Sequence, residues 1–538
     1  MMESVWSKTW DGVAEFSPDA QPPQAWTWGD TQRLPEIVES LGRSVSPSTT
    51  TSEPWAAVVR RGDGSVAAAA SMTVGAGLFY SRISGPENPR LVIGPSLGDV
   101  IRARGSATEL SPSFLGGRLG TRRIHPAETP YREVHRLPPG TTALWRSPSS
   151  NPELSQWCGP ASWPAPEVDG PAVIDTYRRT FDAVVDELVI PGEPICATLS
   201  GGLDSSFLVA SLLRHATPAR PVHAFVHSPR AAAGLEARGN WDPDDFPVAL
   251  SMLRMYPETL KVHRVVNGDA VLPLDEATVA AELHWYPAVN VTNLGWLRRM
   301  SARAAELGAS RLFIGQNGNA AFSYGHPYAL GYHLRQHQWR ALMSLATAYP
   351  QGSAPGVRTG WINLARRAAG ELRARSHPRA DYLNWLAAAN SRATILAFAG
   401  WDAAMIDPFR SSPVVDLAAS MTPAAWARGG TPRGLARLIG EGRVPDEIRL
   451  RTRRGGQSWD SWFLSSGSRE RYFEEARLAM EDPDLNAHMS GLDLCQELSN
   501  WPWGQPLSAT PARWNVVLDV LATAAFTRLT RQRLESLP

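Results

Sequence analysis

The stretch from Ile195 to His215, ICATLSGGLDSSFLVASLLRH, decides the fold of this chain. Its apolar start predicts a buried strand at Ile195–Leu199, and FLVASLLRH predicts a helix at Ser205–His215. The turn between them, SGGLDSS at Ser200–Ser206, lies at the carboxyl end of the strand. Two glycines let the backbone pass close to an anion there, and the following helix presents free N–H groups and the positive end of its dipole. The stretch therefore predicts a phosphate-binding turn in a parallel sheet.

The polar side chains of this turn suit a nucleotide phosphate. Ser200, Ser205 and Ser206 add hydroxyl donors. The carboxylate of Asp204 would repel a phosphate unless a cation lay between them, so we predict that Asp204 is a magnesium ligand. The alternative is a plain glycine-rich turn in which Ser or Asp caps the helix. The turn is not a Walker A loop, because no GK[ST] follows it.

Strands and helices continue to alternate around this stretch, which predicts a parallel sheet covered by helices on both faces. The further strands expected are Val222–His227, Val262–Val266 and Arg311–Gly315. The helices expected are 171–189, Phe246–Met255 and Leu294–Leu307, the last closed by Gly308. From about residue 330 the chain reads as helical, including Ser391–Ala404, Arg433–Ile439 and Trp514–Thr530.

The first 146 residues have a different pattern. Short apolar runs such as Trp55–Arg60 and Ser65–Val74 are broken by Gly, Pro and Ser, which predicts a β-rich domain at 1–146. Residues 147–170 are rich in Pro and Ser and read as a linker. We therefore predict an α/β protein in which a second domain occupies 171–538.

The composition of the 538 residues excludes several classes of protein. With 43% hydrophobic residues, 20% charged residues and a mean hydropathy of −0.23, the chain is not disordered, collagenous or dominated by membrane segments. The 53 basic and 52 acidic residues nearly cancel, so we expect neither nucleic acid nor a membrane as the main partner. Three widely spaced cysteines and a start unlike a signal peptide favour a reducing cytoplasm.

The motifs together resemble a known family. SGGLDSS resembles the pyrophosphate loop of N-type ATP pyrophosphatases, which split ATP into AMP and pyrophosphate. The two-domain plan looks like the asparagine synthetase family. That resemblance implies an Ntn-hydrolase-like glutaminase domain followed by an adenine nucleotide alpha hydrolase-like synthetase domain. TPYREVHRLPPGTTALW is similar to the end of the family's first domain, and DPFRSSPVVDLA and RGLARLIGEGRVPDEIRLRTRRGG are similar to its helical C-terminal region.

Two departures from the family pattern bear on function. Family glutaminases use an N-terminal cysteine, but this sequence begins Met1-Met2-Glu3 and has no cysteine before Cys158. We therefore expect a degenerate glutaminase-like domain and an amine supplied by another molecule. Asn319 also stands where the family has a magnesium-binding aspartate. We expect its carbonyl oxygen to complete the magnesium site with Asp204, and the alternative is an Asn-Gly turn.

IGQNGNAAFSYG, with RRGGQSWDSW downstream, looks most like the asparagine-synthetase-like cyclases of lasso peptide biosynthesis. Those enzymes adenylate an Asp or Glu side chain of a precursor peptide, and the peptide's own N-terminal amine attacks it to close a macrolactam. The resemblance implies ATP and Mg²⁺ as cofactors, a precursor peptide as substrate, and a leader peptidase and a leader-binding protein as partners. A β-lactam synthetase-like enzyme, an ammonia-dependent asparagine synthetase-like enzyme and an inactive scaffold stay open as alternatives.

The resemblance also assigns site residues. The family has a lysine after its VPDEI-like segment, but the only lysines here, Lys8 and Lys261, lie elsewhere. Arg454 is the best positional match and Arg453 the next. Either could stabilise an oxyanion or pyrophosphate but could not act as a base, and a plain surface arginine is the alternative for each. No general base is assigned. By analogy ATP would be bound by Leu199, Ser200, Gly201, Gly202, Asp204, Ser205, Ser206, His227, Ile314 and Gly315.

Other polar residues near the expected site have simpler explanations. Asp242, Asp244 and Asp245 are expected to cap the helix that begins at Phe246, and Asn293 to cap the helix after it. Tyr324 and Tyr328 are expected to pack as aromatic side chains, and an approach to a bound amine is the alternative. The arginines of 349–380 are expected on a solvated helix face or loop, and a docking surface for an acidic peptide is the alternative.

Overall fold

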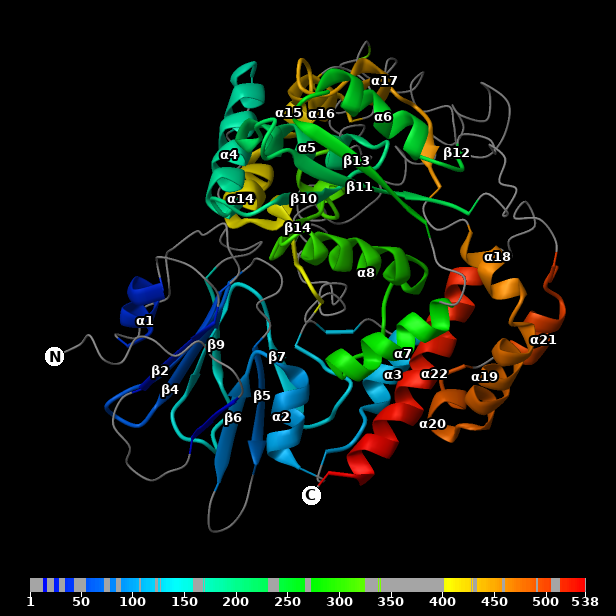
Figure 1. The fold of residues 1–538 in the computed structure, drawn as a ribbon. Coiled ribbons are helices and arrows are strands. Elements are labelled where there is room, and N and C mark those ends of the chain that lie inside the picture. The colour runs from blue at the N-terminus through cyan, green and yellow to red at the C-terminus, as the bar shows by residue number, and fades with distance from the viewer. Residues whose placement is uncertain are drawn as a thin grey trace.

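A five-stranded parallel sheet, of order β13-β11-β10-β14-β15, forms the centre of the second half of the chain (Figure 1). The strand that ends in the predicted phosphate turn, β10, lies in the middle. Its residues alternate between the two faces, so that Ile195 and Ala197 pack into one apolar cluster and Cys196 into another. The strands are β10 (Ile195–Thr198), β11 (Val222–Ser228), β13 (Leu260–Val266), β14 (Arg311–Phe313) and β15 (Ala404–Ile406).

The structure is a computed structural model. It describes residues 13–16, 24–28, 34–42, 55–71, 78–83, 89–105, 108–120, 124–125, 127–157, 168, 170–230, 241–266, 272–324, 337, 339, 401–426, 428, 433–456, 460–489, 492–504 and 513–537. The predictions for 349–380, for Tyr328 and for residues 391–400 lie outside this part of the chain.

Helices cover both faces of the parallel sheet, as predicted (Figure 1). One face is covered by α4 (Ala172–Leu188), α5 (Leu203–Leu212) and α6 (Phe246–Met255), together with α14 (Ser412–Ser420), α15 (Pro423–Trp426), α16 (Gly434–Ile439) and α17 (Asp446–Arg449). The other face is covered by α7 (Pro273–His284) and α8 (Val291–Glu306). Gly308, with φ 85°, follows α8 as the expected C-terminal glycine.

The boundaries differ from prediction in two informative places. Helix α5 begins at Leu203 and ends at Leu212, where a 3-10 helix at Leu213–His215 takes over. The helix expected at Ser391–Ala404 does not reach its end, because Ala404 begins strand β15, which pairs with β14. A three-residue strand at the edge of a sheet is stabilised mainly by pairing with its neighbour, so its own sequence does little to predict a strand.

The N-terminal region is a sandwich of two antiparallel sheets, which confirms the predicted β-rich domain (Figure 1). One sheet has the order β1-β6-β5-β7 and the other β2-β3-β4-β8-β9. Their facing sides enclose one apolar cluster, with Trp145 fully buried. The strands are β1 (Ala14–Phe16), β2 (Gln24–Trp28), β3 (Ala56–Arg60), β4 (Val66–Ala70), β5 (Leu78–Ile83), β6 (Arg90–Gly94), β7 (Val134–Leu137), β8 (Thr141–Trp145) and β9 (Glu153–Gln156).

Strand β9 lies inside the segment 147–170 that we predicted to be a linker. It pairs with β8, so the sheet continues beyond residue 146. Helix α1 (Leu34–Gly42) covers the outer face of the sheet that contains β9. Helices α2 (Leu97–Arg104) and α3 (Pro112–Arg118) pack on the outer face of the other sheet.

The C-terminal helices form a separate layer around the long helix α22 (Trp514–Glu535). Four tryptophans, Trp462, Trp501, Trp503 and Trp514, pack against one another there. The other helices of this layer are α18 (Ser461–Ser466), α19 (Arg469–Glu481), α20 (Pro483–Asn486) and α21 (Leu494–Ser499). In the described part of the chain, no helix has the length and apolar character needed to cross a membrane.

Trp285 joins the two halves of the protein. It follows α7, yet it belongs to the apolar cluster beneath β5, β6 and α2. The guanidinium of Arg533, on α22, lies 3.7 Å from the centre of the Trp285 ring. The backbone carbonyl of Trp285 accepts a hydrogen bond from the hydroxyl of Tyr131, 3.1 Å away. A Cβ at Gly98 would overlap the indole, so α2 approaches the ring as closely as glycine allows.

We expect Trp285→Ala to lower the apparent free energy of unfolding by about 3–5 kcal/mol, because it empties a buried aromatic position. Urea unfolding of the full chain measures this change. Leu283→Ala is the matched control, because Leu283 lies on the same helix with 52% of its surface exposed. It should cost less than about 1 kcal/mol. Equal losses for the two variants would contradict the role given to Trp285.

Candidate functional site

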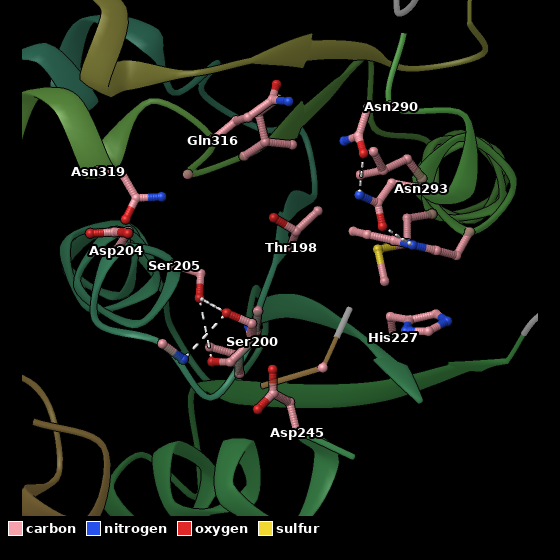
Figure 2. Close-up of a pocket in the computed structure, with 18 of the residues that line it drawn as sticks. Thr198, Ser200, Asp204, Ser205, His227, Asp245, Asn290, Asn293, Gln316 and Asn319 are labelled. Carbon is pink, nitrogen blue, oxygen red and sulfur yellow. Dashed lines mark hydrogen bonds between the residues drawn. The ribbon is translucent and has the colours of Figure 1, made fainter. Parts of the chain in front are cut away.

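A pocket opens at the carboxyl edge of the parallel sheet (Figure 2). The chain runs from β10 to β11 and β13 on one side, then returns to β14 on the other side of β10. Ligands of open parallel sheets bind at such a switch point. The pocket is lined by Thr198, Leu199, Ser200, Gly202, Asp204, Ser205, His227, Pro243, Asp245, Asn290, Asn293, Trp296, Leu297, Met300, Ile314, Gly315, Gln316, Asn319 and Gly456.

Most of the residues predicted to bind ATP therefore meet in one cavity. Gly201 and Ser206 do not line it, although they belong to the turn. Ser206 is fully buried, and its hydroxyl donates to the carbonyl of Ser200 at 3.4 Å. Ser206 thus stabilises the turn from its buried side.

Hydroxyl groups fix the shape of the phosphate turn. The backbone N–H of Ser200 donates to Oγ of Ser205 at 2.9 Å, and the two hydroxyl oxygens lie 2.9 Å apart (Figure 2). The N–H of Gly202 donates to Oγ of Ser200 at 3.3 Å. Gly202 is the N-cap of α5 and provides no side-chain cap. The first turn of this ten-residue helix has no side-chain cap, and its residues Asp204 and Ser205 line the pocket, so this helix end suits an anion.

Asp204 lies deep at the phosphate end of the pocket. Its Oδ1 is buried and has no hydrogen-bond partner in the described structure. Burial raises the pKa of Asp204, and the charge of Arg433 partly offsets this effect. A Cβ at Gly318 would overlap the Asp204 side chain, so the loop after β14 comes as close as glycine permits. A buried carboxylate oxygen without a partner suits a bound cation.

Asn319 faces Asp204 across this end of the pocket (Figure 2). Its Oδ1 accepts a hydrogen bond from Nη2 of Arg433 at 3.0 Å. Arg433 has φ 58°, a left-handed conformation that costs a non-glycine residue about 1 kcal/mol or more. The site thus combines one carboxylate, one amide and one guanidinium. The amide oxygen retains a second lone pair, and its role as a metal ligand stays a prediction.

The donor set fits magnesium bound mainly through a nucleotide. Among the described residues, no group of three or more His, Cys, Asp or Glu side chains could hold a metal ion. Mg²⁺ commonly binds through one or two carboxylates, substrate phosphates and water. Asp204 would therefore hold the ion, which would offset the negative charge of the phosphates.

The other end of the pocket is largely apolar. Trp296, Leu297 and Met300 of α8 face the ends of β10, β11 and β14 across it. His227 lies against Trp296, with ring centres 5.1 Å apart. Burial lowers the pKa of His227 to about 3, so its 3.8 Å contact with Asp460 is not an ion pair at neutral pH. A flat, neutral, apolar slot of this kind suits a nucleobase.

Asn293 does not cap α8, so that prediction was wrong. The helix begins at Val291, and Asn290, with φ 56°, is the N-cap residue. Asn293 lies one turn inside, where its amide nitrogen donates to Oδ1 of Asn290 at 2.6 Å and its Oδ1 accepts from Nε1 of Trp296 at 3.1 Å. This pair of asparagines fixes the indole at the wall of the pocket.

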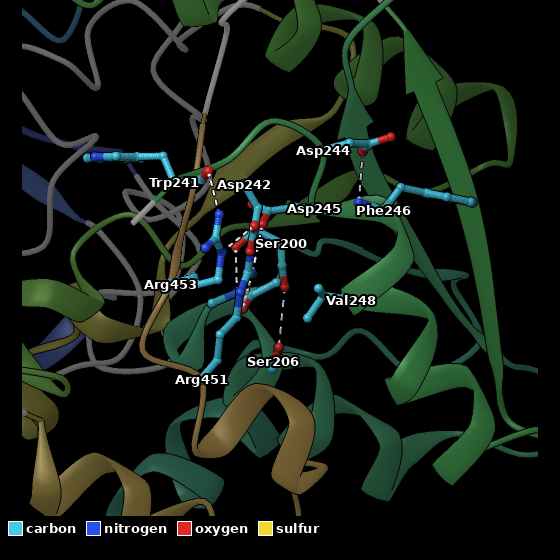
Figure 3. Close-up of polar contacts among 12 residues, drawn as sticks. Ser200, Ser206, Trp241, Asp242, Asp244, Asp245, Phe246, Val248, Arg451 and Arg453 are labelled. Atoms are coloured by element: carbon cyan, nitrogen blue, oxygen red, sulfur yellow. Dashed lines mark hydrogen bonds and ion pairs between the residues drawn. The ribbon is translucent and has the colours of Figure 1, made fainter. Parts of the chain in front are cut away.

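Arg453, one of the two predicted catalytic arginines, does not line the pocket. Arg453 is 40% exposed, and its guanidinium donates to Asp242 at 2.5 Å and to the carbonyl of Trp241 at 3.0 Å (Figure 3). Arg454 pairs through its backbone with Trp241, in the two-residue strands β12 (Trp241–Asp242) and β16 (Arg454–Gly455). The side chain of Arg454 lies outside the described structure. A role for either residue in catalysis stays a prediction.

The sequence interpretation missed Arg451. Its guanidinium is 9% exposed and contacts Asp242 at 2.6 Å and Asp245 at 2.9 Å (Figure 3). Of the three aspartates expected to cap α6, only Asp244 does so through its side chain, by accepting from the N–H of Phe246 at 2.9 Å. The arginine-rich run from Arg449 to Arg454 gave no signal for which of its members turns inward.

Asp407 is a second residue whose role was not foreseen. Its carboxylate accepts from the N–H of Asn317 at 2.8 Å and from the N–H of Phe409 at 3.2 Å. Burial raises its pKa to about 6, against the opposing charge of Arg410 at 3.3 Å. Asp407 therefore anchors the loop that carries Asn319. Tyr324 packs edge-on against Trp426, as expected.

Comparison with known families agrees with this geometry. Residues 176–483, more than half of the chain, match the family model for asparagine synthase. The chain belongs to the asparagine synthase family. No curated protein matches the chain. The match covers both strands that border the switch point, the loop at Asn319 and the segment of Arg451.

Asparagine synthase family members form amides at the expense of ATP, typically with Mg²⁺, so this chain is an ATP-dependent amide-forming ligase. The two ends of the pocket fit that activity. The serine-rich turn and α5 would face the phosphates, and the slot between His227, Trp296 and Ile314 would face the base.

We expect Asp204→Asn to lower ATP–pyrophosphate exchange by about a hundredfold or more, because it removes the carboxylate that we predict to hold magnesium at the phosphate end. The unfolding temperature should stay the same or rise slightly, since the substitution removes a buried charge. The exposed Asp446→Asn is the control and should change neither. Exchange at the native rate in Asp204→Asn would contradict the phosphate assignment.

His227 should make the fold sensitive to acid. Its pKa is about 3 when folded and about 6.5 when unfolded, so below pH 6.5 the unfolded chain binds the extra proton. The free energy of unfolding should therefore fall as pH falls, by about 2 kcal/mol at pH 5 from this residue. Urea unfolding between pH 7 and pH 5 should show a smaller fall for His227→Gln than for the native chain. Parallel losses would refute the assignment.

Proposed function

We propose that this ligase closes a macrolactam in a precursor peptide, as lasso peptide cyclases do. The observation that carries the proposal is the position of the loop after β14. Gln316 and Asn319 belong to the segment that most resembles those cyclases, and both line the pocket, Asn319 beside Asp204. The segment that sets this chain apart within its family is thus part of the site.

The sequence of the N-terminal sandwich favours a reaction in which the substrate itself supplies the attacking amine. The segment 1–146 contains no cysteine, so it holds no thiol nucleophile to release ammonia from glutamine. A peptide that carries both the carboxylate and the attacking amine needs no such release. The proximity of the two groups in one bound molecule would also favour ring closure.

The reaction would proceed in two steps. A side-chain carboxylate oxygen of the peptide attacks the α-phosphorus of ATP, the bond to the bridging oxygen breaks, and pyrophosphate leaves. The N-terminal amine then attacks the acyl carbon, AMP leaves with the ester oxygen, and the nitrogen loses a proton as the amide forms. The serine-rich turn would hold the pyrophosphate in the first step. Stabilisation of the developing oxyanion in the second step is the role that we assign to Arg453 or Arg454.

We expect a candidate precursor peptide to stimulate ATP–pyrophosphate exchange and to lose the mass of one water. Acetylation of its N-terminus should leave the exchange intact and prevent ring formation, because the adenylate still forms but no amine attacks it. Replacement of the acceptor Asp or Glu by Asn or Gln should abolish both. Mass spectrometry and exchange of labelled pyrophosphate measure these outcomes.

Other substrates would overturn the proposal. Exchange that depends on free aspartate, with ammonia consumed, would indicate an asparagine-forming enzyme. Exchange with a small amino-acid derivative that cyclises would indicate a β-lactam-forming enzyme. Absence of exchange with every carboxylate tested would indicate a scaffold without activity. A leader peptidase and a leader-binding protein belong to the same proposal, and adding them should raise the rate with the full precursor.

A further inference from the structure

Arg451 contacts the middle of the phosphate turn. Its Nη1 donates to the carbonyl of Gly201 at 2.9 Å, although the two residues are 250 positions apart in the chain (Figure 3). We infer that Arg451 is a positioning residue that orients the Gly201–Gly202 peptide for phosphate binding. This inference rests on ATP binding, which the family shares, and is independent of the peptide substrate.

The physical reason lies in the planarity of the peptide bond. In a trans peptide the C=O and the following N–H point in opposite directions. A guanidinium that fixes the carbonyl of Gly201 on one side of the turn therefore fixes the N–H of Gly202 on the other. Gly202 lines the pocket, and its N–H points to Oγ of Ser200, which also lines the pocket. Arg451 thus sets the direction of the N–H group that holds the Ser200 hydroxyl at the phosphate end, although Arg451 itself does not line the pocket.

The guanidinium itself is held firmly. Asp242 and Asp245 bind it from two directions, at 2.6 Å and 2.9 Å, and the carbonyl of Arg451 accepts from Arg437 at 2.9 Å. A side chain 9% exposed between two carboxylates has little freedom to move. A Cβ at Gly201 would overlap Nη1 of Arg451, so the turn and the arginine fit only while position 201 is glycine.

The planar fork of arginine is needed for this arrangement. Nη1 donates to the carbonyl of Gly201 and to the carboxylate of Asp245, while Nη2 donates to the carboxylate of Asp242. A lysine ammonium presents one nitrogen and could not span these acceptors in the same geometry. Arg451 does not line the pocket, so its effect on a ligand must pass through the turn.

Arg451→Met in the full chain tests the inference. We expect pyrophosphate and MgATP to bind about ten- to a hundredfold more weakly, measured by calorimetry, because the turn loses a charged hydrogen bond that orients it. Adenosine should bind within about twofold of native, because its slot lies at the other end of the pocket. Arg531→Met is the matched control. Arg531 also pairs with two aspartates, Asp482 and Asp484, but lies on α22 away from the site, and its loss should change none of the three affinities.

Arg451→Lys keeps the positive charge and decides the matter if the methionine variant does not fold. It should bind pyrophosphate about tenfold or more weakly and adenosine normally, because its single nitrogen cannot hold the same three acceptors. Native pyrophosphate affinity in a folded Arg451 variant would overturn the inference. Equal weakening of pyrophosphate and adenosine would also overturn it, because that result indicates general damage to the fold.

Discussion

A buried carboxylate oxygen with no hydrogen-bond partner among the described residues is the constraint around which the site is built. The oxygen of Asp204 is buried at the start of α5, where solvent cannot compensate its charge. Three neighbouring features accommodate this oxygen. Gly318 leaves it room, Arg433 balances part of its charge from a strained backbone position, and Asp407 holds the loop that closes over it. A cation and a triphosphate bound at this end of the pocket would offset that cost.

The parts of the site that lie along one stretch of chain could be predicted, and the parts that depend on distant contacts could not. The strand, turn and helix around Ser200 follow from apolar periodicity and two glycines, and the structure confirms them. Arg451 and Arg433 reach the site from the C-terminal region, and one arginine among many carries no local mark of its contact. Strand β15 was missed for the same reason, because only its pairing with β14 makes it a strand.

The N-terminal sandwich is part of one packed body with the ligase domain. One of its sheets, β1-β6-β5-β7, shares an apolar cluster with α7 and α22, and Trp285 belongs to that cluster. Helix α7 in turn contacts α8, whose Trp296 and Met300 form the wall of the pocket. A sandwich without a cysteine nucleophile in its sequence therefore still supports the helices that shape the nucleotide slot.

The pairing of β12 with β16 has a consequence for the order in which the protein becomes active. The phosphate turn is made early in the chain, but the arginine that fixes it and the glycine that completes the pocket wall come from residues 451 and 456. A growing chain on the ribosome folds its early segments first. The nucleotide site is complete only after most of the polypeptide has been synthesised, so incomplete chains would not hydrolyse ATP.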